Sequence, residues 1–262
     1  MPITISGHAP HLPYADRVNR VDLADVQPWF EQGVKDFAAA PGASLAYGLL
    51  FAGIGLLIAG VLWNTEALYL LLPISAGFML MGPALTVGFQ AISRDLEQGR
   101  KPTLRGALTA WRADAPAVLG LAAILLAVLL VWLRLAQLLY ALVFPPQAGP
   151  TLDSLLSTTF TTGGGLEFLV LFAALGAVMA ALVFAGGAFA LQLMLDRKVG
   201  LTEAVLTSFA AVAANPAPMA LWAALLVGLV FAGMALFYVG LAVTLPLAGH
   251  AAWHAYRAVI KP

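Results

Sequence analysis

Long apolar stretches alternate with short polar ones through most of this 262-residue chain. Four of these stretches are long enough to cross the roughly 30 Å hydrocarbon layer of a bilayer as a helix, which takes about 20 residues. They run from Ala43 to Trp63, Ala67 to Ile92, Pro116 to Phe144 and Leu166 to Leu195. The pattern predicts a transmembrane helix in each, and Pro73, Gly77, Gly82 and Pro83 predict a kink in the second.

The last apolar stretch is too long for a single crossing. Ala217 to Tyr256 holds about forty nearly uncharged residues, twice the length that one crossing requires. We predict a tight turn around Phe237 to Gly240, which would divide this stretch into a fifth and a sixth span. The predicted fold is therefore an all-α, polytopic bundle of six transmembrane helices.

Short amphipathic helices are predicted between the spans, on the cytoplasmic side. Before the first span, apolar residues recur at helical spacing: Val26, Trp29, Phe30, Val34 and Phe37. Charged residues occupy the opposite side, so we expect the apolar face to lie on the bilayer surface or on the protein. Similar helices are predicted at Leu104 to Trp111 and at Leu201 to Ala214.

Two segments lack the pattern of a span. Met1 to Leu23 is polar, contains three prolines and has no periodicity, which predicts a mobile tail. Residues 1–40 would thus form a cytoplasmic tail with an interfacial helix, and residues 41–262 the transmembrane domain. Between the third and fourth spans, Leu152, Leu155, Leu156 and Phe160 indicate a short surface helix, and Gly163 to Gly165 a flexible hinge.

The basic residues predict the orientation of the chain. With six spans and both termini in the cytoplasm, twelve of the thirteen lysines and arginines lie inside, as the positive-inside rule requires. Arg134 alone lies outside, near a helix end, where its long stem can reach the head groups. A five-span arrangement would also place Arg257 and Lys261 outside.

Composition narrows the class of protein. With 61% hydrophobic and only 10% charged residues, the chain has too few polar side chains to cover a soluble globule, and membrane lipids are expected partners. Basic and acidic residues balance, so nucleic acid is not an expected partner. The absence of Cys excludes disulfides, thiolate metal sites and cysteine nucleophiles.

One unit of sequence organisation recurs three times: a short helix with an aromatic residue, a proline, an outgoing span, and an incoming span that ends at an arginine. The aromatics are Phe37, Trp111 and Phe209, the prolines Pro41, Pro116 and Pro216, and the arginines Arg94, Arg197 and Arg257. Triplication of a helical hairpin would explain this, with all copies in one orientation. Generic preferences for Pro at helix starts and Arg at cytoplasmic ends are the alternative.

The end of the last span carries the candidate site. It consists of His250, Trp253, His254, Tyr256 and Arg257. The two histidines are four residues apart and share a helix face. They could ligate zinc or haem iron, or form hydrogen bonds with neighbouring helices or head groups. Two histidines on one helix cannot supply both axial ligands of a haem, and zinc needs further ligands.

We therefore expect both histidines to be structural, each donating to a carbonyl of a neighbouring helix. Trp253, Tyr256 and Arg257 are expected to anchor the helix end at head-group level. No catalytic, cofactor or metal residue is predicted. The predicted spans also lack ionisable groups near the bilayer midplane, which disfavours a proton pump or an ion-coupled transporter.

Four segments resemble one family. Pro246 to Arg257 reads Pro-Leu-Ala-Gly-His-Ala-Ala-Trp-His-Ala-Tyr-Arg, and Pro41-Gly42, Gly82-Pro83 and the Asp95 to Gly99 loop also match. They resemble a family of bacterial integral inner-membrane proteins that carry a domain of unknown function. Some of its members are labelled putative cytochrome c oxidase subunits. The resemblance implies a bacterial inner-membrane location and, in respiration, an accessory role.

Three hypotheses for function follow. The first is a non-catalytic accessory or assembly subunit that packs against other subunits of a larger membrane complex, such as a respiratory oxidase. The alternative is a transporter or channel for a small or apolar molecule. The third is an enzyme or haem protein that uses His250 and His254. A polar cavity at the bilayer midplane would favour transport, whereas a filled core with an exposed groove of small residues would favour a partner.

Overall fold

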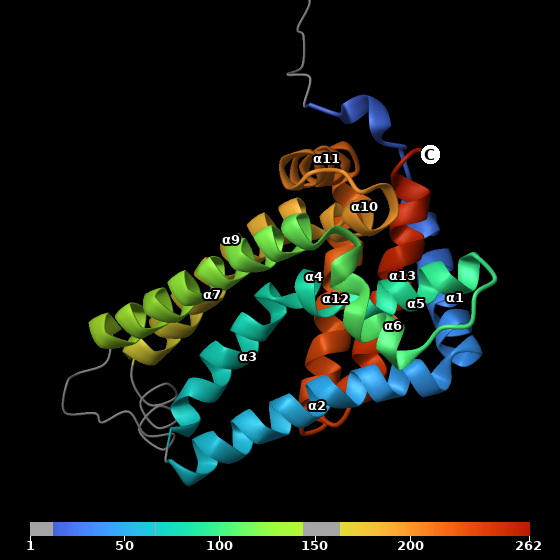
Figure 1. The fold of residues 1–262 in the computed structure, drawn as a ribbon. Helices are drawn as coiled ribbons and strands as arrows, with labels where there is room; N and C mark the ends of the chain where they lie inside the picture. The colour runs from blue at the N-terminus through green and yellow to red at the C-terminus, as the bar shows by residue number, and fades with distance from the viewer. Residues whose placement is uncertain (1–12, 66, 144–162) are drawn as a thin grey trace, which may run out of the picture.

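The computed structural model describes residues 13–65, 67–143 and 163–262, and within these ranges it contains helices and no strand. The longer helices are α1 (Val26–Ala39), α2 (Pro41–Asn64), α3 (Leu71–Leu80), α5 (Val87–Glu97), α7 (Ala115–Val143), α9 (Gly163–Gly187), α10 (Ala190–Arg197), α11 (Leu201–Ala214), α12 (Pro216–Ala235) and α13 (Leu241–Val259) (Figure 1). The short helices are α4 (Gly82–Leu85) and α6 (Leu104–Thr109), with 3-10 turns at Ala15–Arg17, Leu23–Asp25, Leu68–Leu70 and Ala110–Asp114.

Four helical segments of the described chain are long and apolar enough to cross a membrane. They are Pro41–Asn64, Leu104–Val143, Gly164–Arg197 and Pro216–Ala235. These correspond to the predicted first, third, fourth and fifth spans. The fold is therefore confirmed as all-helical with several membrane-spanning helices, but the count of six is not, because the second and sixth predicted spans fall outside this set.

The second predicted span is interrupted rather than merely kinked. α3 ends at Leu80, and the single turn of α4 separates it from α5. Pro83 lies in α4, and a proline cannot donate the backbone hydrogen bond that a continuous helix needs at that place. The interruption thus falls at the predicted Gly82-Pro83 position, and it leaves an apolar helix of only ten residues before it.

The predicted turn between the last two spans is present. α12 ends at Ala235 and α13 begins at Leu241, and Phe237 and Tyr238 between them have positive φ angles of 51° and 62°. Glycine lets the two helices close tightly there, since a Cβ on Gly233 would lie 2.3 Å from Thr244 Oγ1. α13 then continues through Pro246 without a break.

α13 is the central helix of the bundle. It packs against α1, α2, α5 and α12 (Figure 1). Its contact with α2 is close because Gly48 faces the backbone of Ala242: a Cβ on Gly48 would lie 2.5 Å from the Ala242 carbonyl oxygen. Further along, Gly55 of α2 faces the ring of Tyr238. These contacts explain why small residues stand on this face of α2.

The amphipathic helix α1 packs on the protein, one of the two places expected for its apolar face. Val26 and Trp29 are buried, and the Trp29 ring meets Trp222 of α12 edge-on at 5.8 Å. Gly33 brings α1 onto α13, since a Cβ there would lie 2.7 Å from the Ala251 backbone nitrogen. Val34, predicted for the same face, is exposed.

The second half of the predicted mobile tail is held in place. The backbone N–H of Asn19 donates to the carbonyl of Val259 at 2.8 Å, and that of Lys261 donates to Arg17 at 2.9 Å. Arg17 also pairs with Glu203 of α11, whose hydrogen bond raises the pKa of the guanidinium. The expectation of a loose tail is therefore wrong from about this point onward. It failed because the partners are at the far end of the sequence.

The segment between the third and fourth predicted spans is only partly described. The proposed surface helix with Leu152, Leu155, Leu156 and Phe160 lies outside the described residues. The three glycines from Gly163 to Gly165, expected to form a hinge, instead begin α9. This prediction was wrong because the helix of the apolar run that follows extends toward the N-terminus to include these glycines.

α7 and α9 lie side by side and point away from α12 and α13 (Figure 1). Aromatic rings of both helices form their own small core, in which Trp132 lies 4.8 Å from Phe172. The indole N–H of Trp132 donates to the Pro73 carbonyl of α3 at 2.8 Å, which ties this pair to the neighbouring helix. Arg134, on the exposed face of α7, contacts Gln137.

Candidate functional site

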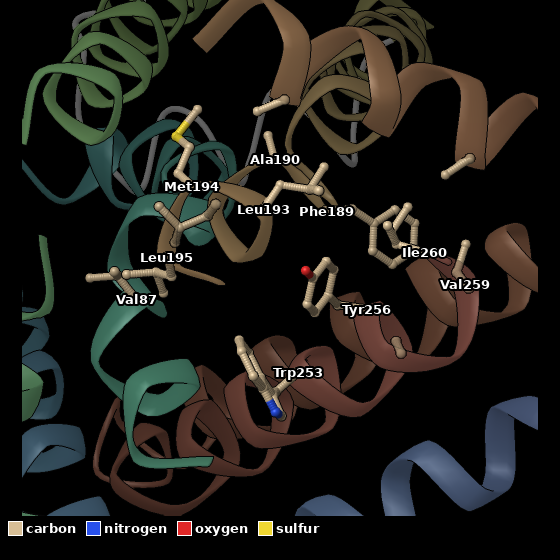
Figure 2. Close-up of a cluster of buried hydrophobic side chains, with 14 of the residues drawn as sticks. Val87, Phe189, Ala190, Leu193, Met194, Leu195, Trp253, Tyr256, Val259 and Ile260 are labelled. Atoms are coloured by element: carbon tan, nitrogen blue, oxygen red, sulfur yellow. The ribbon is translucent and has the colours of Figure 1, made fainter. Parts of the chain in front are cut away.

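The five candidate residues lie in the last turns of α13, where this helix meets the ends of α5 and α10. Gly249 permits the approach, since a Cβ there would lie 2.6 Å from the Phe89 Cβ of α5. Figure 2 shows Trp253 and Tyr256 of α13 among Leu193 and Leu195 of α10. α13 thereby brings its polar groups against two other helices at once.

His250 is fully buried and bridges two helices. Its Nε2 lies 2.9 Å from the Ser44 hydroxyl of α2, and its Nδ1 lies 2.8 Å from the Ser93 hydroxyl of α5. A neutral imidazole has one donor and one acceptor nitrogen, and a hydroxyl can serve either. Both ring nitrogens are therefore engaged by hydroxyls, not by the carbonyl expected from the sequence.

His254 points to a different helix. Its Nε2 lies 2.8 Å from Asp36 Oδ2 of α1. The side chain is 24% exposed, so this contact is at the edge of the bundle rather than in its core. The two histidines thus share one side of α13, as predicted, but each fastens a different partner to it.

Trp253 and Tyr256 do not anchor the helix in lipid head groups, because both are fully buried within the protein. The indole N–H of Trp253 donates to Glu97 Oε2 at 3.1 Å, and the Tyr256 hydroxyl donates to Asp196 Oδ2 at 2.7 Å. The prediction of an interfacial anchor is therefore wrong for these two residues. Their amphipathic rings suit a protein interior equally well when the polar atom finds a partner.

Arg257 joins three helix ends. Its Nη2 lies 2.8 Å from Glu97 Oε2 at the end of α5, and its Nη1 lies 2.9 Å from Asp196 Oδ2 in α10. Partial desolvation lowers the pKa of this guanidinium, but the hydrogen bond with Glu97 and the charges of both carboxylates outweigh it. The pKa of Arg257 is raised as a result. The guanidinium also lies 4.9 Å from the centre of the Trp253 ring.

The other two arginines at the ends of incoming helices make related contacts. Arg94 donates to the Leu195 carbonyl of α10 at 2.7 Å, and Arg197 donates to the carbonyl of Lys261 after α13. Arg94 and Arg197 therefore each contact the end of the helix that closes the next unit, and Arg257 contacts the ends of the first and the second. We call Arg94, Arg197 and Arg257 the arginine ring.

The polar contacts of the site hold helices together. The described residues hold no group of three His, Asp or Glu side chains placed to bind a metal ion. Each of the five candidate residues makes at least one polar contact within the protein, and the partners come from α1, α2, α5 and α10. The arrangement fastens the end of α13 to four helices.

Sequence reasoning missed the partners of the site. These are Asp36, Ser44, Ser93, Glu97 and Asp196. Each lies between 60 and 218 positions along the chain from the α13 residue that it contacts. The sequence contained a hint for two of these partners. Glu97 and Asp196 lie within three residues of Arg94 and Arg197, the arginines predicted to end two of the spans.

A separate feature is an apolar cleft of about 580 Å³ between α3, α4, α5, α9, α10, α11, α12 and α13. Its wall is almost wholly apolar and includes Pro83, Phe184 and Trp222. Exposed residues of α9 and α12 form part of the rim, among them Ala177 and Val227. The cleft therefore opens on the outer surface of the apolar helices.

Comparison with known proteins places the chain in a class. Residues 70–196 match the model of a family described as "Predicted integral membrane protein (DUF2189)". Together with the four long apolar helices, this makes the protein an integral membrane protein. No curated protein and no solved structure matches.

The resemblance to a family of integral membrane proteins of unknown function is thus confirmed, with a different extent than expected. The match includes Gly82-Pro83 and the Asp95 to Gly99 loop. It includes neither Pro41-Gly42 nor Pro246 to Arg257, although the last of these had suggested the family most directly.

Proposed function

We propose that the protein is a non-catalytic subunit of the bacterial inner membrane that assists or assembles a larger membrane complex. A respiratory oxidase is the complex that the family resemblance suggests. Its partners would be other membrane protein subunits and lipids, and nucleic acid would not be among them. His250 and His254 would hold helices together and would carry no metal or haem.

The observation that supports this proposal is the exposed face of α9. Of the four candidate spans, the one that contains α9 is the least covered by its own chain, with only 17% of its most apolar stretch buried. Ala173, Ala174, Ala177 and Ala181 lie exposed at helical spacing along it. Small residues let another helix approach closely, which is how helices associate in lipid.

The topology in this proposal has six spans with both termini in the cytoplasm. It is supported by the distribution of basic residues and by the turn at Phe237 to Gly240, which returns the chain toward the side where α12 began. In this topology the interrupted α3 to α5 segment and α13 each complete a crossing, although neither contains a long, uniformly apolar helix. Packing against α2 and α7 would supply the partners that such broken helices need.

The arginine ring supports a threefold repeat within the chain. Each of the three proposed units ends in one of its arginines, and each arginine reaches the next unit in order, with Arg257 also reaching Asp196 of the second unit. Generic preferences for Arg at cytoplasmic ends explain why the residues are basic but not why their contacts form a cycle. A triplicated hairpin with a pseudo-axis along the membrane normal would produce such a cycle.

The accessory role can be tested by purification in mild detergent, followed by mass spectrometry of the proteins that remain bound. Ala174→Trp would place a bulky side chain on the exposed face of α9, at a position that does not itself line the cleft. We expect it to remove a defined partner that the wild type and Leu57→Trp retain. Leu57→Trp is the matched control, since it lies exposed on α2. Identical sets of proteins from all three would contradict the role.

The alternative is a transporter for a small apolar molecule, and the cleft is the observation that favours it. Its apolar wall suits an apolar solute and would exclude an ion. Reconstitution into liposomes tests this role: transbilayer movement of an apolar dye that exceeds the rate in liposomes without protein would support transport. Equal rates would contradict it.

A further inference from the structure

Two glutamines in the cleft have unpartnered carbonyl oxygens. Gln90 of α5 and Gln192 of α10 both line the cleft and are 2% and 1% exposed. The Gln90 amide donates to Thr86 Oγ1 at 3.2 Å, and the Gln192 amide donates to the Ala188 carbonyl at 3.0 Å. The Ala188 carbonyl can only accept, and the Thr86 hydroxyl itself donates to the Gly82 carbonyl at 3.1 Å, so the amide NH2 group makes both contacts. No described group donates to either Oε1.

The unpartnered acceptors in this apolar cleft indicate the chemistry of a ligand that would bind there. Buried polar groups in proteins normally have hydrogen-bond partners, so two unpaired oxygens at one site need a reason. A carbonyl oxygen accepts only, and the partner must therefore donate. None of the described residues that line the cleft has an ionisable side chain, so a charged head group would be buried there without a counter-charge from them.

The position of the two glutamines sets the orientation of the ligand. Gln90 and Gln192 stand four and five residues before Arg94 and Arg197, near the end of the bundle that carries the arginine ring. Phe78, Met79 and Val230 also line the cleft, at positions farther from the arginine ring. The cleft is thus polar near the arginine ring and apolar beyond it, and its volume lies in the range of roughly 300–1,000 Å³ typical of small-molecule sites.

We propose that this cleft binds a neutral lipid with an aliphatic hydroxyl group, such as a monoacylglycerol or a long-chain alcohol. The hydroxyl donates to Gln90 or Gln192, and the acyl or alkyl chain lies along the apolar wall beside Trp222. The rim of the cleft shares Ala177 and Ala181 with the exposed face of α9, but the polar end at Gln90 and Gln192 lies outside that face. Substitution of the two glutamines therefore tests the lipid site, and Ala174→Trp tests the protein partner.

Quenching of tryptophan fluorescence tests this site, because Trp222 is part of the wall. The purified full chain in detergent micelles is titrated with three lipids that carry the same brominated chain: a monoacylglycerol, a long-chain alcohol and a methyl ester. The first two can donate a hydrogen bond and the ester cannot. We expect saturable quenching by the two hydroxyl lipids, with the tighter of them identifying the preferred head, and no saturable quenching by the ester.

Substitution locates the binding. The double variant Gln90→Leu and Gln192→Leu should weaken binding of the hydroxyl lipids by roughly ten-fold or more. The control Gln32→Leu, on the exposed face of α1, should leave it unchanged, and Trp222→Phe should remove most of the quenching. Circular dichroism checks that each variant is folded, and the double variant should melt no lower than the wild type, since it removes unpaired acceptors.

Two results would overturn the proposal. Equal quenching by all three lipids would mean that any acyl chain fills the cleft without recognition. Unchanged binding to the folded double variant would mean that the glutamines do not contact the hydroxyl.

Discussion

Arg257 Nη2 lies 2.8 Å from Glu97 Oε2, although 160 residues separate them in the chain. The same guanidinium holds Asp196, so one side chain ties α13 to the ends of both α5 and α10. This pairing depends on the fold as a whole and stabilises the end of the bundle that we assign to the cytoplasm.

A double-mutant cycle between Arg257→Ala and Glu97→Gln should give a coupling energy of up to about 1 kcal/mol. The value is small because both side chains are about one-third exposed or more, and solvent screens the pair. Unfolding of the purified protein in a denaturing detergent measures it. A coupling energy of zero would mean that the pair does not form in the membrane protein.

His250 should be the more costly of the two histidines to replace. His250→Leu leaves the buried hydroxyls of Ser44 and Ser93 without their partner, which costs about 1–3 kcal/mol. His254→Gln should cost less because that contact is partly exposed. Replacing both serines with Ala in the His250→Leu background should recover part of the loss, as unfolding curves would show. No recovery would contradict the bridge.

Metal analysis separates a structural role of the histidines from ligation. Because both ring nitrogens of His250 contact hydroxyls, the purified protein should contain well below one equivalent of iron or zinc per chain. It should also lack a Soret band. One equivalent of metal that disappears when both histidines are changed to Gln would move the protein to the redox class.

Two glycines of the described helices offer a matched test of packing. A Cβ on Gly33 would lie 2.7 Å from the backbone of Ala251, so Gly33→Ala should separate α1 from α13 at a cost of about 1–3 kcal/mol. Gly53 has no atom within 4 Å of the corresponding position. Gly53→Ala should therefore be neutral or stabilising by up to about 1 kcal/mol. Equal effects of the two changes in thermal unfolding would contradict the α1 to α13 contact.

The membrane topology can be tested by labelling single introduced cysteines, because the chain contains no cysteine of its own that would react. An impermeant thiol reagent should label Leu166→Cys, at the exposed start of α9, in intact cells. It should label Pro262→Cys only after the cells are opened. Labelling of Pro262→Cys in intact cells would place the C-terminus outside and exclude six spans.

Local sequence patterns predicted most of the helices, since length and hydrophobicity of one segment decide whether it can cross a membrane. α2, α7, α9 and α12 follow from those two quantities. The start of α12 at Pro216 also follows from local chemistry, because proline suits the first turn of a helix. The turn at Phe237 was placed by length alone, and the structure confirms it.

The candidate site depends on contacts that no local pattern contains. Trp253 and Tyr256 have the composition of an interfacial anchor, and only the packing of α5 and α10 over them shows that they are buried. In the same way, Asn19 looked unstructured because its partner is Val259, 240 residues away. Hydrophobicity predicts the environment of a helix, but the neighbours of each side chain come from the tertiary fold.

The most direct test of the accessory role is photo-crosslinking in living cells from the exposed face of α9. A photoreactive amino acid at Ala174 should yield one discrete adduct with another membrane protein, because this face is the least covered apolar surface of the chain. The same amino acid at Leu57, exposed on α2, provides the comparison. A defined protein adduct from Ala174 and none from Leu57 is the predicted result. Adducts with lipid alone from both positions would contradict the role.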